Sequence, residues 1–149
     1  MGRVREACMS GAEGLATYFG GLDDGDIPRA SSAFADGAFY IRQSMDERGV
    51  PTSELETIAG RDAIEAYFLA RGQRPYRHTL LSSSRAGDEE YAEGVVLGGA
   101  DGPNVTFIAR ATLDGQGRIA RYFALASPIS EAAALELQRT SNTAVAGGR

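Results

Sequence analysis

The sequence predicts a single α+β domain in which a strongly curved, mainly antiparallel sheet wraps around helices. Apolar residues in the first half recur with the spacing i, i+3, i+4, i+7 of a helix face, whereas the second half contains four β-favouring runs separated by turns. A chain of 149 residues is long enough for one hydrophobic core but short for two. Helices segregated to one side of a curved sheet leave a conical concavity, which is the usual place for a ligand.

A first helix is expected over about residues 3–22. Its apolar face consists of Leu15, Tyr18, Phe19 and Leu22. The run Asp23-Asp24-Gly25-Asp26 ends this helix. A short second helix is expected over about 27–34, with Asp26 as its N-cap and Pro28 in its first turn.

A first strand is expected at 38–42, followed by a loop over 44–59 that contains glycine, proline and several charges. A third helix over 60–70 places Phe68 on its buried side and ends before a glycine. The four strands of the second half are expected at about 77–85, 90–97, 105–113 and 118–126.

The end of the chain completes this pattern. Asp114-Gly115-Gln116-Gly117 predicts a hairpin turn, because glycine tolerates positive φ. Ser127-Pro128 is typical of a helix start and predicts a last helix through about Gln138. Residues 140–149 are small and polar, so we expect a frayed tail, and 1–149 is expected to be one domain.

Composition excludes several classes of function. The net charge of −5 argues against nucleic-acid binding, which needs a basic face. The single cysteine, Cys8, and the single histidine offer no disulfide and no set of metal ligands. No stretch is apolar enough to cross a membrane, no signal peptide is recognisable, and no phosphate-binding loop is present. We therefore expect a cytoplasmic protein without metal or cofactor.

Four stretches together resemble the NTF2-like superfamily, which includes ketosteroid isomerases, scytalone dehydratase, limonene epoxide hydrolase and SnoaL-type polyketide cyclases. They are Tyr18 to Asp26, the turn Phe34 to Ala38, the helix start Gly60 to Ile64, and the hairpin Leu113 to Ile119. The resemblance covers about Leu15 to Ser127. It implies a cone in which the sheet wraps three helices from the first half of the chain, with a further C-terminal helix. It does not choose a reaction, because this fold hosts many chemistries as well as non-catalytic members.

The resemblance also implies which side chains face the cavity, although a one-residue slip would invert any strand. The expected inner set is Ala38, Tyr40, Arg42, His78, Leu80, Ala92, Gly94, Val96, Phe107, Ala109, Ala111, Tyr122 and Ala124. Small members of this set favour an open cavity. Glu93 is expected to face outward.

His78 is the most informative candidate. Histidine is the side chain best suited to proton transfer near neutral pH, and the place of His78 is similar to that of a catalytic histidine in scytalone dehydratase. A histidine held by hydrogen bonds at a strand end is the structural alternative. Tyr18 matches the tyrosine that serves as an oxyanion donor in ketosteroid isomerases. It also lies on an apolar helix face, so a purely core role stays open for it.

Tyr40 and Tyr122 combine packing area with a polar hydroxyl, so each is a candidate for the site or the core. Arg42 stands where ketosteroid isomerases have their general-base aspartate, and Ala109 stands where they have a second acid. Steroid isomerisation by that mechanism is therefore not expected. Arg42 would instead hold a carboxylate, phosphate or enolate. The structural alternatives are an ion pair with a carboxylate such as Glu56 or Glu93, or exposure near the end of the strand.

The resulting hypothesis is a cofactor-independent lyase or isomerase that acts on a small, largely apolar or aromatic carbonyl or hydroxy compound by dehydration, isomerisation or cyclisation. His78, Tyr18 and Tyr40 would be catalytic. The substrate-binding residues would be Arg42, Tyr122, Phe107 and Phe68. The alternative is a non-catalytic binding or assembly domain of the same fold. Apolar residues on the outer sheet face, such as Val95, predict a homodimer through that face unless the last helix covers it.

Overall fold

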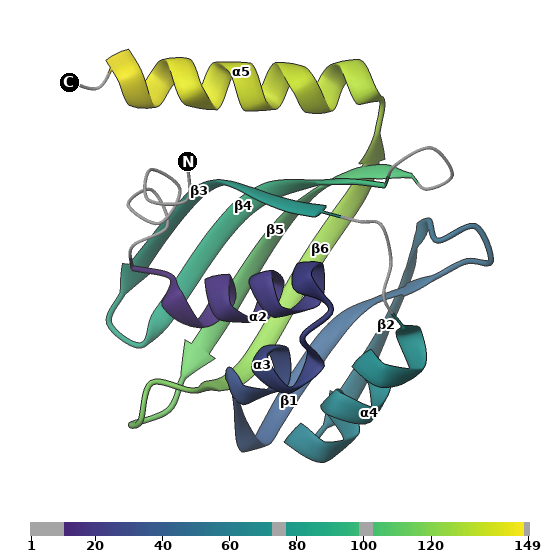
Figure 1. Ribbon diagram of the computed structural model, residues 1–149, viewed down its shortest axis with the longest axis vertical. Helices are drawn as coiled ribbons and strands as arrows, with labels where there is room; N and C mark the ends of the chain where they lie inside the picture. The colour runs from purple at the N-terminus through teal and green to yellow at the C-terminus, as the bar shows by residue number, and fades with distance from the viewer. Residues whose placement is uncertain (1–10, 73–76, 99–102, 148–149) are drawn as a thin grey trace.

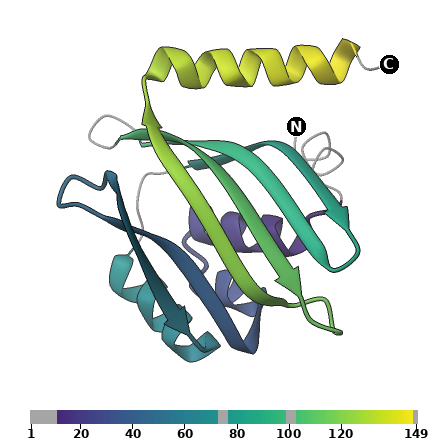
Figure 2. The ribbon, with the colours of Figure 1, turned by 180° about the vertical axis from the view of Figure 1, so that it is seen from behind.

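The computed structural model describes residues 11–72, 77–98 and 103–147 and has the expected α+β architecture. Its helices are α2 (Glu13–Asp24), α3 (Ile27–Ser32), α4 (Arg61–Arg71) and α5 (Glu131–Gly147). Its strands are β1 (Phe34–Met45), β2 (Pro51–Ala59), β3 (Arg77–Ala86), β4 (Glu89–Leu97), β5 (Asn104–Leu113) and β6 (Ile119–Ile129). Figure 1 shows α2, α3 and α4 on one side of the curved sheet, and Figure 2 shows the sheet from its other side.

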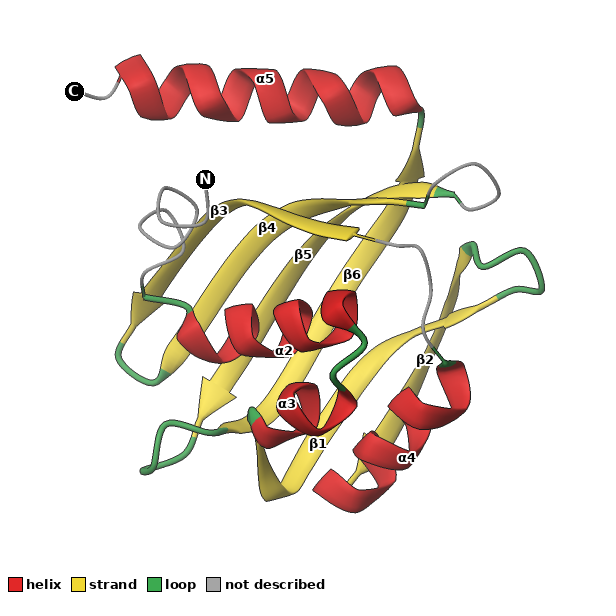
Figure 3. Cartoon of the chain, viewed as in Figure 1, coloured by secondary structure: helices red, strands yellow, loops and turns green. Residues whose placement is uncertain are grey.

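The strands form one sheet in the order β2-β1-β6-β5-β4-β3. All neighbours are antiparallel except β1 and β6, which pair in parallel. The parallel pair therefore joins the local hairpin β1–β2 to the meander β3–β6. The separation of helices from strands is clear in Figure 3.

Strand β2 corrects the sequence prediction, which had a loop from 44 to 59. The segment is an edge strand whose residues are exposed or half-buried. Pro51 is its first residue, a position where an edge strand tolerates proline because no ladder donor is lost. The sheet consequently has six strands rather than five.

The second helix begins as predicted, because the Asp26 carboxylate accepts the backbone N–H of Arg29. The last helix does not begin at Ser127-Pro128. Those residues belong to β6, and the hydroxyl of Ser130 accepts the N–H of Ala133 at the start of α5. Helix α5 runs from Glu131 to Gly147, past the end at Gln138 expected from the sequence. The fraying expected for residues 140–149 stays a prediction.

The N-terminus of α2 is capped from the sheet rather than from its own sequence. Its N-cap residue, Ala12, has no side-chain acceptor. The carboxylate of Glu90, on β4, instead accepts the N–H groups of Gly14 at 3.2 Å and Leu15 at 2.9 Å. Glu90 is only 1 % exposed, so this buried carboxylate fixes α2 against the inner face of the sheet.

Helices α2 and α3 pack closely where Gly21 faces Ala30. A Cβ atom on Gly21 would lie 2.5 Å from the backbone nitrogen of Ala30, which no side chain can accommodate. Helix α5 packs against β3, β4 and β5 at one end of the sheet. Val95, which points away from the cavity, is completely buried there, and so is Ala134 of α5.

Candidate functional site

A cavity of about 590 Å³ lies between the helices and the inner face of the sheet. This volume is in the usual range for a small-molecule site. All seven side chains singled out from the sequence line it, namely Tyr18, Tyr40, Arg42, Phe68, His78, Phe107 and Tyr122. The hairpin between β1 and β2 contributes Met45, Asp46 and Glu47 to the lining.

An aromatic cluster forms the deep part of the cavity. The rings of Tyr40 and Tyr122 stack with their centroids 4.8 Å apart, and Tyr18 stacks on Phe68 at 5.4 Å. The hydroxyl groups of Tyr18 and Tyr40 are hydrogen-bonded to each other. None of these four rings is more than 5 % exposed, so they combine core packing with cavity lining.

Burial raises the pKa values of the Tyr18, Tyr40 and Tyr122 hydroxyls above the ordinary tyrosine value, because a phenolate would lose its hydration there. The three phenols therefore stay protonated at neutral pH. A protonated phenol can donate a hydrogen bond to a developing oxyanion, although the Tyr18–Tyr40 hydrogen bond already uses the proton of one of that pair.

These shifts predict a loss of stability at alkaline pH. Above about pH 10 the unfolded chain releases the three protons, whereas the folded chain retains them, so the free energy of unfolding falls as pH rises. The slope reaches about 1.4 kcal/mol per pH unit for each tyrosine. Chemical denaturation at several pH values measures it, and Tyr122→Phe should make the slope shallower. A slope that is the same in Tyr122→Phe would contradict the assignment.

His78 is held by a carboxylate that the sequence analysis did not select. The backbone N–H of His78 donates to Asp23 Oδ2 at 2.8 Å, and its ring Nδ1 lies 2.7 Å from Asp23 Oδ1. The ring also stacks on Phe19 with centroids 4.7 Å apart. Since a carboxylate accepts hydrogen bonds, Nδ1 carries the proton, and Nε2 is the ring nitrogen left for the cavity.

Asp23 was missed because it was interpreted only as part of the stop signal after the first helix. One local signal could have identified it. A carboxylate in the last turn of a helix interacts unfavourably with the partial negative charge at that end of the helix dipole. Helix α2 has no basic residue in its last turn to compensate. Such a residue needs a partner elsewhere, and its partner lies 55 residues further along the chain.

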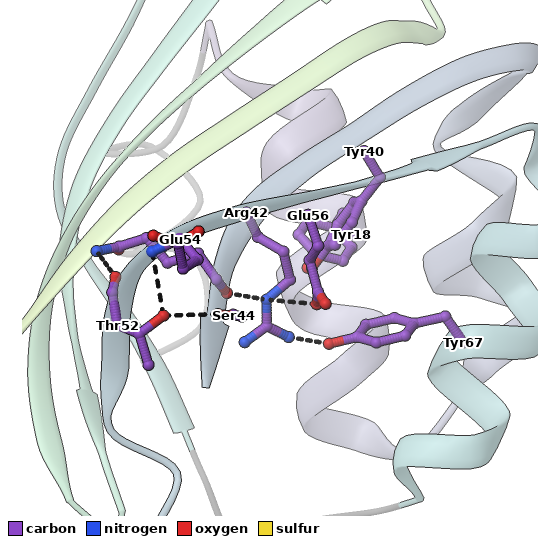
Figure 4. Close-up of polar contacts among 9 residues, drawn as sticks. Tyr18, Tyr40, Arg42, Ser44, Thr52, Glu54, Glu56 and Tyr67 are labelled. Carbon is purple, nitrogen blue, oxygen red and sulfur yellow. Dashed lines mark hydrogen bonds and ion pairs between the residues drawn. The ribbon is translucent and has the colours of Figure 1, made fainter. Parts of the chain in front are cut away.

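Arg42 enters the cavity from β1, and its side chain is 14 % exposed. Its Nε donates to the carbonyl of Gln43, Nη1 donates to the Tyr67 hydroxyl, and Glu56 Oε1 lies 3.7 Å from Nε. Figure 4 shows the contacts that Arg42 makes with the Tyr67 hydroxyl and the Glu56 carboxylate. Burial acts to lower the pKa of Arg42, but the phenols of Tyr40, Tyr67 and Tyr18 and the Glu56 carboxylate raise it, so the cation is retained.

Gln43, next to Arg42 on β1, forms side-chain hydrogen bonds to both neighbouring strands, β2 and β6. Its amide nitrogen donates to the Thr52 carbonyl at 3.0 Å, and its amide oxygen accepts the N–H of Ala126 at 2.7 Å. The hydroxyl groups of Ser44 and Thr52 are 2.6 Å apart, which links β1 to β2 again at the mouth (Figure 4).

The small residues do less to open the cavity than the sequence predicted. Ala109 and Ala111 are completely buried in the core, and of the expected small residues Ala124 lines the cavity. A Cβ atom on Gly94 would lie 2.6 Å from Cζ of Phe107, so Gly94 makes room for that ring rather than for a ligand.

Glu90 is the second acidic residue that sequence analysis missed. The glutamate weighed from the sequence, Glu93, is exposed as expected. The register that places Ala92 inside also places Glu90 inside, two residues earlier on the same strand. Glu90 is not part of the cavity lining, and its two hydrogen bonds go to α2.

No group of three histidine, cysteine or carboxylate side chains is placed to hold a metal ion in the described part of the chain. None of the helices in that part combines the length and apolar character needed to cross a bilayer.

No family model matches the sequence, and no curated protein matches it. Solved structures do match the fold. An NTF-2-like protein of unknown function from Burkholderia xenovorans superimposes with a TM-score of 0.61 at 16% identity, covering 86% of this chain and 89% of that one. A protein with a ketosteroid isomerase-like fold from Catenulispora acidiphila, solved in complex with trimethylamine, gives 0.61 at 17% identity, covering 87% and 95%.

The epoxide hydrolase/cyclase-like enzyme SalBIII, which has a role in forming the pyran ring of the polyether salinomycin, is also similar. Its TM-score is 0.57 at 18% identity, over 77% of this chain and 88% of that one. These likenesses extend over most of this chain and most of each matched chain. The chain therefore has the cone-shaped α+β fold of the NTF2-like superfamily.

Proposed function

We propose that this protein is a cofactor-independent enzyme that performs acid–base chemistry on a small, largely apolar carbonyl or hydroxy compound. The observation that carries the proposal is the Asp23–His78 pair in the wall of an aromatic cavity. A carboxylate on Nδ1 fixes the tautomer of the imidazole and supports the cation that forms when Nε2 takes a proton. His78 is thus the general acid/base of the proposed reaction.

The tyrosine hydroxyls supply the electrophilic side of this chemistry. Removal of a proton next to a carbonyl builds negative charge on the carbonyl oxygen. The phenols of Tyr18 and Tyr40 are buried and share one hydrogen bond, so one hydroxyl of this pair can donate to that oxygen. In a dehydration the departing hydroxyl group must also receive a proton to leave as water, and the protonated His78 can supply it. Dehydration, isomerisation and cyclisation all need this combination of one base and one oxyanion donor.

A panel of small aromatic, polyketide-like and terpenoid carbonyl compounds tests the proposal. Thermal shift identifies compounds that stabilise the wild type and His78→Gln, and product analysis then follows turnover. The proposal expects a compound that stabilises both proteins and is converted only by the wild type. Equal conversion by both proteins would remove His78 from the mechanism.

The second candidate function is a non-catalytic binding domain. The observation that favours it is the hydrogen bond between Tyr18 and Tyr40, because one of these two deep hydroxyl protons is already used within the protein without a ligand. In that case some compounds would stabilise the wild type and none would be converted by it.

We further propose that the protein is cytoplasmic. It is also proposed to form a homodimer through the outer face of the sheet. Ile108 and Leu125 are partners in the β5–β6 register and are 66 % and 49 % exposed. Phe39, from β1, is 50 % exposed on the same side of the sheet. Helix α5 covers the face at Val95 and leaves this apolar area open.

Charges placed in this area should separate the dimer. We expect Ile108→Lys with Leu125→Lys to sediment as a monomer where the wild type sediments as a dimer, because burying two ammonium groups in an apolar interface is unfavourable. Leu69→Lys is the matched control, since Leu69 is 62 % exposed on α4, away from the sheet face. A monomeric wild type would refute the dimer.

A further inference from the structure

The guanidinium of Arg42 has donors that the protein does not use. Arginine carries five N–H groups. Among the described residues, one is donated to the Gln43 carbonyl and one to the Tyr67 hydroxyl. The remaining donors are on Nη1 and Nη2, the edge that binds a carboxylate through two parallel hydrogen bonds.

These donors are open to the cavity rather than buried without partners. The atom found buried and unpartnered in the described residues is Nε of Arg118, and no atom of Arg42 is in that state. Arg42 lines the cavity, and its side chain is nevertheless only 14 % exposed. A cation so poorly hydrated interacts with an anion more strongly than a surface arginine does.

The charges around Arg42 bear on how many negative charges a bound anion can carry. Glu56 faces Arg42 across the β1–β2 register, but it approaches only Nε, at 3.7 Å, and its side chain is 43 % exposed. Asp46 at the mouth is engaged by the backbone N–H groups of Arg48 and Val50. Because Glu56 already offsets part of the Arg42 charge, a dianion such as a phosphate would be less well compensated there than a monoanion.

We propose that the cavity selects amphipathic monocarboxylates, with a flat unsaturated body on the aromatic cluster and the carboxylate on Nη1 and Nη2 of Arg42. The inference rests on the proposed use of this cavity as a small-molecule site, and it adds the chemical class of the molecule. Tyr67 orients the guanidinium from α4, and Glu56 limits the affinity by its opposing charge.

Two probes of the same shape test this inference, 2-naphthoate and its uncharged amide, 2-naphthamide. The chain contains no tryptophan, so naphthalene fluorescence reports binding without interference from that residue. All titrations use the His78→Gln background, in which binding is separated from turnover. We expect the acid to bind about 10- to 100-fold more tightly than the amide, as for a charge-assisted bidentate pair.

Substitutions of Arg42 and of Glu56 should change the preference for the acid over the amide in opposite directions. Arg42→Gln should make the affinities for the acid and the amide equal. Arg42→Lys keeps the positive charge but cannot form two parallel hydrogen bonds, so it should retain part of the preference for the acid. Glu56→Gln should increase the preference for the acid, and it tests the inference even if Arg42→Gln does not fold. Arg71→Gln is the matched control, because Arg71 also lines the cavity and is not assigned to the carboxylate.

Equal affinity of the parent for acid and amide would overturn the inference, and so would loss of the preference in Arg71→Gln but not in Arg42→Gln. These outcomes are independent of catalysis. An Arg42-dependent preference without turnover of any compound would leave the ligand class intact and refute the enzyme. Turnover of neutral compounds, without any preference for the acid over the amide, would support the enzyme and refute the ligand class.

Discussion

Asn in place of Asp23 is expected to lower the rate of the proposed reaction by about 10²- to 10⁴-fold, with little change in substrate binding. Asp23 acts through His78, because its carboxylate accepts hydrogen bonds from the ring Nδ1–H and the backbone N–H of His78. An amide at this position can present its NH₂ group to Nδ1, which would then have to be the unprotonated nitrogen. The proton would move to Nε2, and the base would no longer face the cavity.

The tautomer can be measured without knowing the substrate. His78 is the single histidine of the chain, so ¹⁵N-labelled histidine gives one pair of ring nitrogen resonances. We expect a protonated Nδ1 and a bare Nε2 in the wild type, and the reverse in Asp23→Asn. An unchanged tautomer together with a reduced rate would show that Asp23 is structural rather than a positioning residue. A matched control is Asp24→Asn, because Asp24 pairs with Arg29 and Arg77 at the surface.

Glu90→Ala is expected to destabilise the fold by about 2–4 kcal/mol. The substitution removes a buried acceptor and leaves the N–H groups of Gly14 and Leu15 without it at the start of α2. That helix carries Tyr18 and Asp23, so the cavity wall should loosen together with the helix. Urea denaturation measures the loss.

Two neighbouring substitutions separate the capping role from general effects. Glu90→Gln keeps one acceptor oxygen and should be intermediate. Glu89→Ala changes the adjacent glutamate, which points to the other face and pairs with Arg110, and it should have a small effect. If Glu89→Ala and Glu90→Ala were equally destabilising, the cap would not explain the result.

Much of the fold could be predicted because its signals are local. The apolar face of α2, the cap of α3 at Asp26 and the hairpin turn at 114–117 each depend on a few consecutive residues. Strand β2 escaped because an edge strand exposes most of its side chains, so no alternation of apolar residues marks it. The first turn of α5 was misplaced because Ser127-Pro128 has the composition of a helix start while its backbone belongs to β6.

The candidate site was predictable in part for the same reason. Alternation along the strands places Tyr40, Arg42 and Tyr122 on the inner face, and they line the cavity together. Their roles stay predictions. Asp23 and Glu90 depend on contacts between residues that are 55 and 75 positions apart, and nothing in the neighbouring sequence specifies such a distance.

The parallel β1–β6 pair has a consequence for folding kinetics. The hairpin β1–β2 and the meander β3–β6 can each form from residues close in sequence, but β1 meets β6 only after about eighty residues of chain have been closed into a loop. Tyr40 and Tyr122 are directly paired in that contact, so we expect the binding site to be assembled only when β1 and β6 pair. A ligand of the cavity should therefore slow unfolding while leaving the refolding rate unchanged. The ligand-bound protein would owe its longer lifetime entirely to a higher activation barrier for unfolding.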